Sequence, residues 1–407
     1  MMSEVALTVA ASLKDVSRED WDRVANPGWR LPEGGRLEPE DDARPPARPY
    51  NPFLAHDFLW SLEEAGCATA RTGWLGQHLL LFGDDRRLAA AVPAYLKSHS
   101  QGEYVFDYGW ADAYERAGGR YYPKLQVCVP FTPATGPRLL APPGDDEDAR
   151  RAVLAAGLTE LCRRHGASSV HATFVEERDA AVFEEAGYLM RIDQQFHWTN
   201  RGYGDYEAFL GDLASRKRKA LRRERREALG EGITVEWLTG KDLAEEHWDA
   251  FHRFYMDTGS RKWGRPYLNR TFFSLVSQRM ADRILLVMAR RDGRPIAGAL
   301  NFIGSDRLYG RNWGCVEDHP FLHFEVCYHQ AIDFAIAHGL SVVEAGAQGE
   351  HKLARGYLPV TTRSAHYLPD PGFRAAVADY LARERRVVAG HAEALTEMGP
   401  FRRSEEA

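Results

Sequence analysis

The hydrophobic and polar positions along the chain switch between a two-residue and a 3.6-residue period, which predicts strands interleaved with helices. In the first half, strands are predicted over residues 78–82, 88–96, 125–131 and 169–174. Residues 148–165 keep a helical period, and a shorter helix over 178–186 ends before Gly187. This order of elements is typical of an α/β sheet covered by helices.

The second half of the chain repeats this order of elements. Strands are predicted over 233–238, 284–290, 295–303, 307–313, 340–344 and 362–368, and helices over 244–258, 266–280, 323–338 and 371–396. Asp292-Gly293 is a strong hairpin signal between two of the strands. We therefore predict an N-terminal domain over 1–200 with an exposed proline-rich insertion at 26–50. Next along the chain we predict a C-terminal domain over 201–370 and a final helix with a polar tail over 371–407.

Charge is distributed very unevenly along the 407 residues, whose net charge is −6. From Arg216 to Arg226, eight of eleven residues are Lys or Arg and one is Glu, so this segment carries +7 and the remainder −13. Five apolar residues keep a helical spacing around it: Phe209, Leu213, Ala220, Leu221 and Ala228. The basic segment is therefore predicted to be a helix that opens the second domain.

The cations of this helix suit an anion, because arginine makes bidentate phosphate contacts and lysine supplies a point charge. The predicted phosphate-binding residues are Arg216, Lys217, Lys219, Arg222 and Arg223. The alternative interpretation is a solvated helix paired with acidic surface. Aromatic residues are not interleaved with the cations, so a general RNA-binding module is not indicated.

Several classes of protein are excluded by the sequence. No run of about 18 apolar residues predicts a membrane span, and the N-terminus lacks the features of a signal peptide. The five cysteines form no CxxC pair, so we expect reduced thiols and a cytoplasmic protein. Cys315, His319, His323 and Cys327 form a weak metal-like cluster interrupted by Pro320, and no metal site is predicted there.

Candidate chemistry concentrates around the last helix and strand of the second domain, where open α/β sheets place ligands. Glu325 or His351 is the predicted base, and Tyr328 is a proton donor or a core residue. The predicted catalytic residues are Glu325, His351, His323 and Tyr328, and the predicted binding residues are Glu344, Gln348, Glu350, Lys352 and Arg355. Glu350 has the alternative role of a helix N-cap.

The first domain offers a second group of candidates. Aromatic residues beside acids suit a cationic amine or a sugar, whereas the alternative is an irregular packed loop. The predicted substrate-binding residues of this group are Asp107, Trp110, Tyr114, Lys124 and Arg138, the last as an anion contact.

Long blocks of the sequence resemble a known family. NPFLAHDFLWSLEEAG, YYPKLQVCVPFTPATGPRLL, NWGCVEDHPFLHFEVCYHQAIDFAI and EAGAQGEHKLARGYLP are similar to blocks of the FemAB-like, predicted N-acyltransferase family, which is associated with the GNAT fold. The resemblance runs from Asn51 to about Pro369, and the proline-rich insertion departs from it. It implies an α/β protein of two tandem GNAT-like domains with mixed sheets in a FemAB-like arrangement.

The resemblance also implies transfer of an activated acyl group, from acyl-CoA or another thioester, to an amine. The acceptor would be a small molecule, a peptide or a cell-wall precursor, and no cofactor would be bound permanently. The alternatives are a Fem-type peptidyltransferase, with a tRNA or acyl carrier as donor, and a non-catalytic precursor-binding protein. GCVEDHPFLHFE occupies the place where GNAT enzymes hold the CoA pyrophosphate, and this acidic stretch with one glycine argues against ordinary acetyl-CoA.

Overall fold

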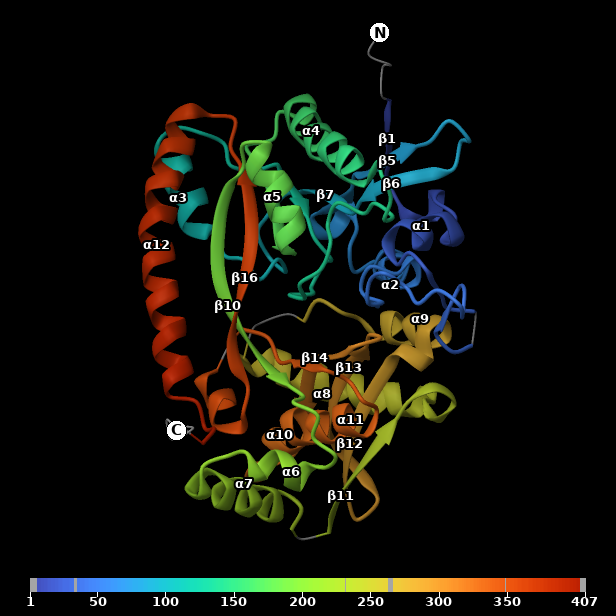
Figure 1. Ribbon diagram of the computed structural model, residues 1–407, viewed down its shortest axis with the longest axis vertical. Coiled ribbons are helices and arrows are strands. Elements are labelled where there is room, and N and C mark those ends of the chain that lie inside the picture. Colours follow the sequence, from blue (N-terminus) through green and yellow to red (C-terminus); the bar gives the residue numbers. More distant parts are fainter. Residues whose placement is uncertain (1–5, 33–34, 231, 263–265, 348, 403–407) are drawn as a thin grey trace. The chain divides into compact units, whose positions relative to one another are not determined.

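The computed structural model describes residues 6–32, 35–230, 232–262, 266–347 and 349–402. They form two compact units, whose elements are labelled in Figure 1. Unit 1 contains the described residues of Met1–Leu31, Leu37–Asp193 and Thr362–Val388. Unit 2 contains those of Pro32–Arg36, Gln194–Thr361 and Ala389–Ala407.

These units differ from the predicted division in where the last 45 or so residues belong. Residues 362–388 join unit 1, because the end of β16 (Leu358–Tyr367) pairs antiparallel with β9 (Val170–Val175). The first turns of α12 (Pro371–Glu397) also pack there through Phe373, Val377 and Leu381. Leu395 packs in the core of unit 2 instead, so the segment 371–407 is not a unit of its own.

Unit 1 contains a mixed sheet with strands in the order β16-β9-β8-β7-β4, a three-stranded sheet β1-β5-β6 and a short pair β2-β3. Its remaining strands are β1 (Leu7–Ala10), β2 (Trp29–Arg30), β3 (Glu38–Pro39), β4 (Trp74–Gly76), β5 (His78–Phe82), β6 (Leu88–Val92), β7 (Ala94–Lys97) and β8 (Lys124–Val127). Its other helices are α1 (Arg18–Ala25), α2 (His56–Glu64), α3 (Tyr108–Arg116), α4 (Glu147–His165) and α5 (Glu177–Glu185). The strands predicted over 78–82 and 169–174 are confirmed, whereas the single strand predicted over 88–96 is divided into β6 and β7, which belong to different sheets. α3 lies in a segment with no clear period.

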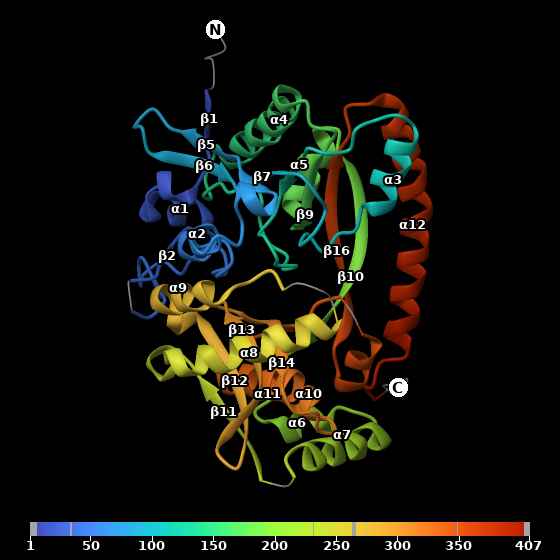
Figure 2. The same cartoon turned by 180° about the vertical axis from the view of Figure 1, so that it is seen from behind.

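The parallel pair β8 and β9 is joined by α4, and the three elements share one core. Leu154 and Leu158 of α4 pack there with Leu125 and Val127 of β8. Gly166 ends α4 in a left-handed conformation that glycine adopts without strain. On the other side of unit 1, α3 lies beside the first turns of α12, as both views show (Figures 1 and 2).

Unit 2 repeats this architecture with strands in the order β11-β12-β13-β14-β15-β10. They are β10 (Leu189–Thr199), β11 (Ile233–Leu238), β12 (Ile284–Arg291), β13 (Arg294–Ile303), β14 (Arg307–Cys315) and β15 (Val342–Glu344). The helices are α6 (Tyr206–Gly211), α7 (Ser215–Ala228), α8 (Glu245–Lys262), α9 (Arg270–Met280), α10 (Leu322–Phe324), α11 (Gln330–Ala337) and the 3-10 helix η6 (Glu350–Arg355). The predicted hairpin is confirmed, with Asp292 and Gly293 both at positive φ between β12 and β13.

The predicted single helix over 323–338 is interrupted. After the single turn of α10, residues Glu325–His329 form a π-helical turn before α11 begins. A π-turn inserts one residue into the helical repeat, and such turns occur often at functional sites. In this turn Glu325 and His329 bond side chains of α7, and Tyr328 bonds a side chain of η6.

Candidate functional site

The candidate site lies in unit 2, where two parallel strands separate. β14 pairs with β15 at three positions, of which the last is Tyr309 with Glu344. β14 continues to Cys315, whereas the chain after β15 stays bonded to β10, with the Ala345 amide 3.0 Å from the Phe196 carbonyl oxygen. Ligands of open α/β sheets bind where neighbouring strand ends separate, and we call this place the crevice. His351 and Lys352 after β15, together with the π-turn, supply polar side chains near this place.

His351 and Tyr328 are brought together at this crevice. The Tyr328 hydroxyl lies 3.0 Å from Nε2 of His351, which is exposed at the start of η6. The rings of His323 and Phe324 lie 6.2 and 5.3 Å from the His351 ring, measured between centroids. Burial raises the pKa of Tyr328 well above its usual range, so this hydroxyl keeps its proton at neutral pH. The pair therefore offers an exposed imidazole with a protonated partner behind it.

Lys352 is the second titratable group of the segment. Its side chain is buried, and its ammonium donates to the carbonyl oxygens of Ala345 and Gly346 at 2.5 and 3.2 Å. Burial lowers the pKa of Lys352 to about 8. A cation held by two neutral carbonyls, without a carboxylate at bonding distance among the described residues, is suited to a transient negative charge.

Glu325 has a different environment from the one expected of a base. Its carboxylate is fully buried and accepts hydrogen bonds from Nη2 and Nε of Arg225 at 2.9 and 3.1 Å and from the Gln330 amide at 2.7 Å. Arg225 also pairs with Asp333 at 2.6 Å. A carboxylate whose lone pairs are occupied in this way is poorly placed to take a proton from substrate. The structure therefore favours a role for Glu325 in fixing α7 to the π-turn.

Glu224 and His329 were missed by the sequence analysis. Glu224 accepts hydrogen bonds from Nε and Nη2 of Arg355 at 2.8 and 2.5 Å, and it also bonds Nε2 of His329 at 2.7 Å. A signal was present, because the one acid in the basic segment lies three residues after Leu221 and four before Ala228, on the buried face. Arg355 is buried in this pair and does not reach solvent as a substrate contact, which differs from its predicted role.

The outward face of α7 remains cationic. Arg222 and Arg223 of the predicted phosphate-binding set pair with Glu207 and Glu227. Four other exposed cations of α7 have no ion-pair partner among the described residues: Arg216, Lys217, Lys219 and Arg226. Ala220 was expected on the apolar face but is exposed. α7 begins only at Ser215, after the separate helix α6, so the predicted helix is two helices.

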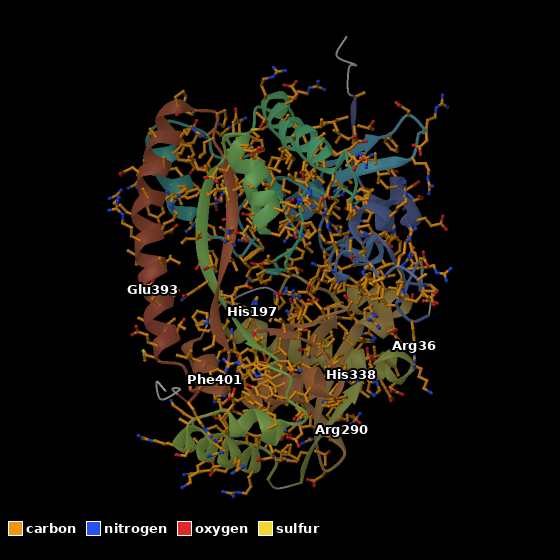
Figure 3. All side chains as sticks on the ribbon, in the orientation of Figure 1. Arg36, His197, Arg290, His338, Glu393 and Phe401 are labelled. Carbon is orange, nitrogen blue, oxygen red and sulfur yellow. The ribbon has the colours of Figure 1, made fainter. Side chains whose placement is uncertain are left out.

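The other predicted residues of this domain lie around the crevice. Glu344 is buried and pairs with Arg307 at 2.9 Å, and His197 of β10 lies 3.9 Å from its other oxygen (Figure 3). It therefore has the environment of a structural ion pair. Gln348 and the side chain of Glu350 lie outside the described residues.

Asp107 and Lys124 of unit 1 lie in a buried charge cluster, not on a cleft wall. The Lys124 ammonium is fully buried and donates to Glu103 at 2.6 Å, to Ser100 at 2.8 Å and to Asp107. Burial opposes ionisation of Asp107, but the charge of Lys124 outweighs it and lowers the pKa of this carboxyl well below its usual range. The expected substrate contact is therefore replaced by an internal salt bridge.

Arg138 is likewise corrected by the structure. Its guanidinium is fully buried and donates to the carbonyl oxygens of Ala134, Gly136, Pro137 and Thr173 at 2.7 to 3.2 Å. The loop after β8 is thereby fastened onto β9, and Arg138 is not available to an external anion. The sequence pattern of turn residues gave no sign that this loop is packed inward.

Trp110 and Tyr114, the remaining predicted residues of unit 1, line a groove between α3 and α12 with a volume of about 700 Å³. The described residues contain no group of three His, Cys, Asp or Glu side chains arranged to hold a metal ion. Across the same described ranges, no helix has the length and apolar character needed to cross a bilayer.

Comparison with known proteins bears on this architecture. A sequence profile of the FemAB-like family, described as peptidoglycan biosynthesis/recognition, matches residues 12–403. No curated protein sequence matches the chain. The crystal structure of FemX is 12% identical with a TM-score of 0.50, and the alignment covers 78% of this chain and 93% of FemX.

Two further solved structures are similar. A conserved protein of unknown function from Bacteroides thetaiotaomicron is 10% identical with a TM-score of 0.50, over 90% of this chain and all of that chain. A tandem GNAT protein from the clavulanic acid biosynthesis pathway is 12% identical, with a TM-score of 0.45, over 90% of this chain and 99% of that one. Identities this low concern the fold alone. The chain belongs to the FemAB-like family of peptidoglycan biosynthesis/recognition, and its α/β fold is similar to that of FemX.

Proposed function

We propose that this protein transfers an activated acyl or aminoacyl group to an amine, with the chemistry in the crevice of unit 2. One observation carries the proposal: the hydrogen-bonded pair of His351 and Tyr328 adjoins, in sequence, a buried lysine whose pKa is lowered to about 8. Amide formation needs a base for the ammonium nucleophile, a donor for the tetrahedral oxyanion and a proton for the leaving group. The three side chains match these three requirements.

His351 is the proposed base, in preference to Glu325. The imidazole is exposed at the crevice, whereas the Glu325 carboxylate is occupied by Arg225 and Gln330. Tyr328 bonds the same imidazole and stays protonated, so it can pass a proton onward once His351 has taken one. His323, whose ring is 5.6 Å from the Tyr328 ring, lines the same place.

Lys352 is the proposed oxyanion donor. An ammonium has three N–H groups, and two of them are directed at the Ala345 and Gly346 carbonyls. The third is available for the oxygen of a tetrahedral intermediate. The lowered pKa of Lys352 contributes to this role, because a lysine whose pKa is about 8 exchanges a proton with a bound substrate more readily than an ordinary lysine.

The donor is proposed to be a phosphate-bearing carrier held by α7. Arg216, Lys217, Lys219 and Arg226 are exposed cations of α7 that no carboxylate among the described residues neutralises. In contrast, the loop between β14 and α10 contains Glu317, which pairs with Arg291 and Arg294, and α10 has a single turn. This loop lacks the regular helix N-terminus that usually binds a pyrophosphate. Aminoacyl-tRNA and acyl carriers therefore fit better than acetyl-CoA, and the amine of a cell-wall precursor is the proposed acceptor.

The first experiment measures transfer by the full chain from a panel of acyl-CoAs and aminoacyl-tRNAs to peptidoglycan precursors. With the donor that works, His351→Ala should lower kcat by about 100-fold and Lys352→Gln by a similar factor, because each loses a group of the transition state. The matched control is His338→Ala, an exposed histidine at the end of α11 (Figure 3), which should keep full activity.

Two outcomes would contradict the proposal. Unchanged kcat in His351→Ala would remove it as the base. Precursor binding without turnover of any donor would instead favour the alternative in which the protein only recognises the precursor.

The donor site has its own test. Changing Arg216, Lys217, Lys219 and Arg226 together to Gln should raise the donor KM by 10-fold or more at low salt and leave kcat nearly unchanged. A matched control changes Arg222 and Arg223, which are already paired with Glu207 and Glu227, and should have a smaller effect. If the wild type, the four-residue variant and the control have equal donor KM values, α7 does not bind the donor and is a solvated helix.

A further inference from the structure

Unit 1 contains a groove that the proposed chemistry does not use. It runs between α3 and the first turns of α12 and has a volume of about 700 Å³, within the range of small-molecule pockets. Small residues are part of its lining: Gly109 and Ala113 on α3, Ala117 directly after it, and Gly372 and Ala376 on α12. Large side chains at these positions would reduce its volume.

The walls of the groove are aromatic. Trp110, Tyr114 and Phe373 stand along it, and the Tyr114 and Phe373 rings are stacked at 4.4 Å. Phe106 and Tyr380 at its rim are 59% and 42% exposed, which is unusual for rings of this size in water. An apolar ligand would therefore cover surface that is otherwise left against solvent.

The polar groups of the lining are few and mostly occupied. Asp370 is the one charged residue of the lining, and its carboxylate accepts the Phe373 amide at 2.6 Å as the cap of α12. The Tyr380 hydroxyl donates to Glu384 at 2.9 Å. A sugar or a peptide backbone entering the groove would give up its hydrogen bonds to water with little replacement. A hydrocarbon chain gives up none.

The place of the groove between two packed helices also bears on its occupant. A single extended chain is narrow enough to lie between the helices. We propose that the groove between α3 and α12 binds one aliphatic chain of an amphiphile, with the polar head left in water. The site lies within unit 1 and does not depend on the proposed transfer reaction.

The test uses alkyl maltosides of 6 to 12 carbons, each below its critical micelle concentration, titrated calorimetrically into the full chain. The Kd should fall two- to fourfold for each added methylene, and maltose alone should not bind. Ala113→Trp and Ala376→Trp should each weaken dodecyl maltoside binding at least 10-fold, because an indole at either position occupies part of the groove. Both alanines are exposed, so the indoles do not enter the core, which unchanged circular dichroism would verify.

The matched control is Ala375→Trp, an exposed neighbour on α12 that does not line the groove and should bind as the wild type does. A Kd independent of chain length, or normal binding by both Ala113→Trp and Ala376→Trp, would overturn the proposal. Two arms distinguish the source of the chain. Competition by palmitoyl-CoA but not by CoA points to an acyl thioester, and sedimentation with phosphatidylcholine vesicles that Ala113→Trp abolishes points to a membrane lipid.

Discussion

The two units contain the same parallel strand pair and differ in the path that the chain takes beyond the paired positions. In unit 2, β14 and β15 separate after Tyr309 and Glu344, and the crevice receives His351, Tyr328 and Lys352. In unit 1, β8 and β9 pair over three positions in the same way. There the chain itself returns, with the Gly136 amide 3.1 Å from the Phe174 carbonyl oxygen and Arg138 bonded to Thr173.

Under the proposed function, this difference gives the two units different tasks. The strand ends of unit 1 are closed by their own loop, and its buried charges cluster around Lys124, the first residue of β8. Those of unit 2 leave an exposed histidine beside a buried lysine. Reactive groups are therefore expected in unit 2, while the burial of ionic groups in unit 1 serves its folding and specificity.

The largest expected effect comes from breaking the charge cluster of unit 1. Lys124→Met leaves the carboxylates of Glu103 and Asp107 buried without their main cation, which should lower the free energy of unfolding by about 3–5 kcal/mol. Hydrogen exchange read by mass spectrometry can place this loss in unit 1. Lys217→Met, on the exposed face of α7, is the control and should change stability by less than about 0.5 kcal/mol. A loss below about 1 kcal/mol in Lys124→Met would mean that the cluster is not a structural feature.

A smaller effect is expected when the ion pair beneath α7 is broken. Glu325→Gln keeps the shape of the side chain but removes the charge that faces Arg225, so stability should fall by about 1–3 kcal/mol. Under conditions where the protein stays folded, kcat should change by less than about threefold, because the carboxylate is not the proposed base. A 100-fold loss of kcat in Glu325→Gln with unchanged stability would reverse the assignment and make Glu325 catalytic.

The smallest expected effect concerns pH. His171 and His366 are buried in unit 1 with their Nδ1 atoms 2.7 Å apart, and burial lowers the pKa of His171 to about 3 and that of His366 well below its usual range. In the unfolded chain each of these histidines binds a proton near pH 6.5, whereas in the folded chain it stays neutral at that pH. The contribution of the pair to stability is therefore complete above pH 6.5 and decreases as the pH falls toward 3. Each histidine contributes at most about 1.4 kcal/mol per pH unit.

The contribution of this pair to the unfolding free energy should therefore decline between pH 6.5 and 5, whereas buried Asp22 and Asp179, whose pKa values burial raises to about 7 and about 6, contribute with the opposite sign. Relative to the wild type, His171→Asn should lose about 1 kcal/mol less over this range. His338→Asn, in the exposed position on α11, should leave the slope unchanged. Identical slopes in wild type and His171→Asn would show that the buried pair does not control acid stability.

Much of the architecture could be predicted, because periodicity records which side of each element is buried. The strands around 78–96 and 284–303, the hairpin at Asp292-Gly293 and the last helix are all visible in local pattern. The family blocks indicated the two tandem domains. The sequence pattern does not predict α3, because its buried residues Trp110 and Ala111 are adjacent and give no helical period. The pattern does not predict the π-turn either, because the spacing of its apolar residues fits an α-helix equally well.

The sequence by itself determined that a basic helix and a polar, glycine-punctuated segment exist and that the chain has a FemAB-like fold, since charge density and hydrophobic period are local properties. Only the tertiary structure decided which charged groups are buried and bonded to other groups of the protein. Glu325, Arg355, Lys124 and Arg138 were all candidate site residues, and each is buried against a partner from another element. A buried charge needs such a partner to offset its desolvation, and that partner is chosen by proximity in space.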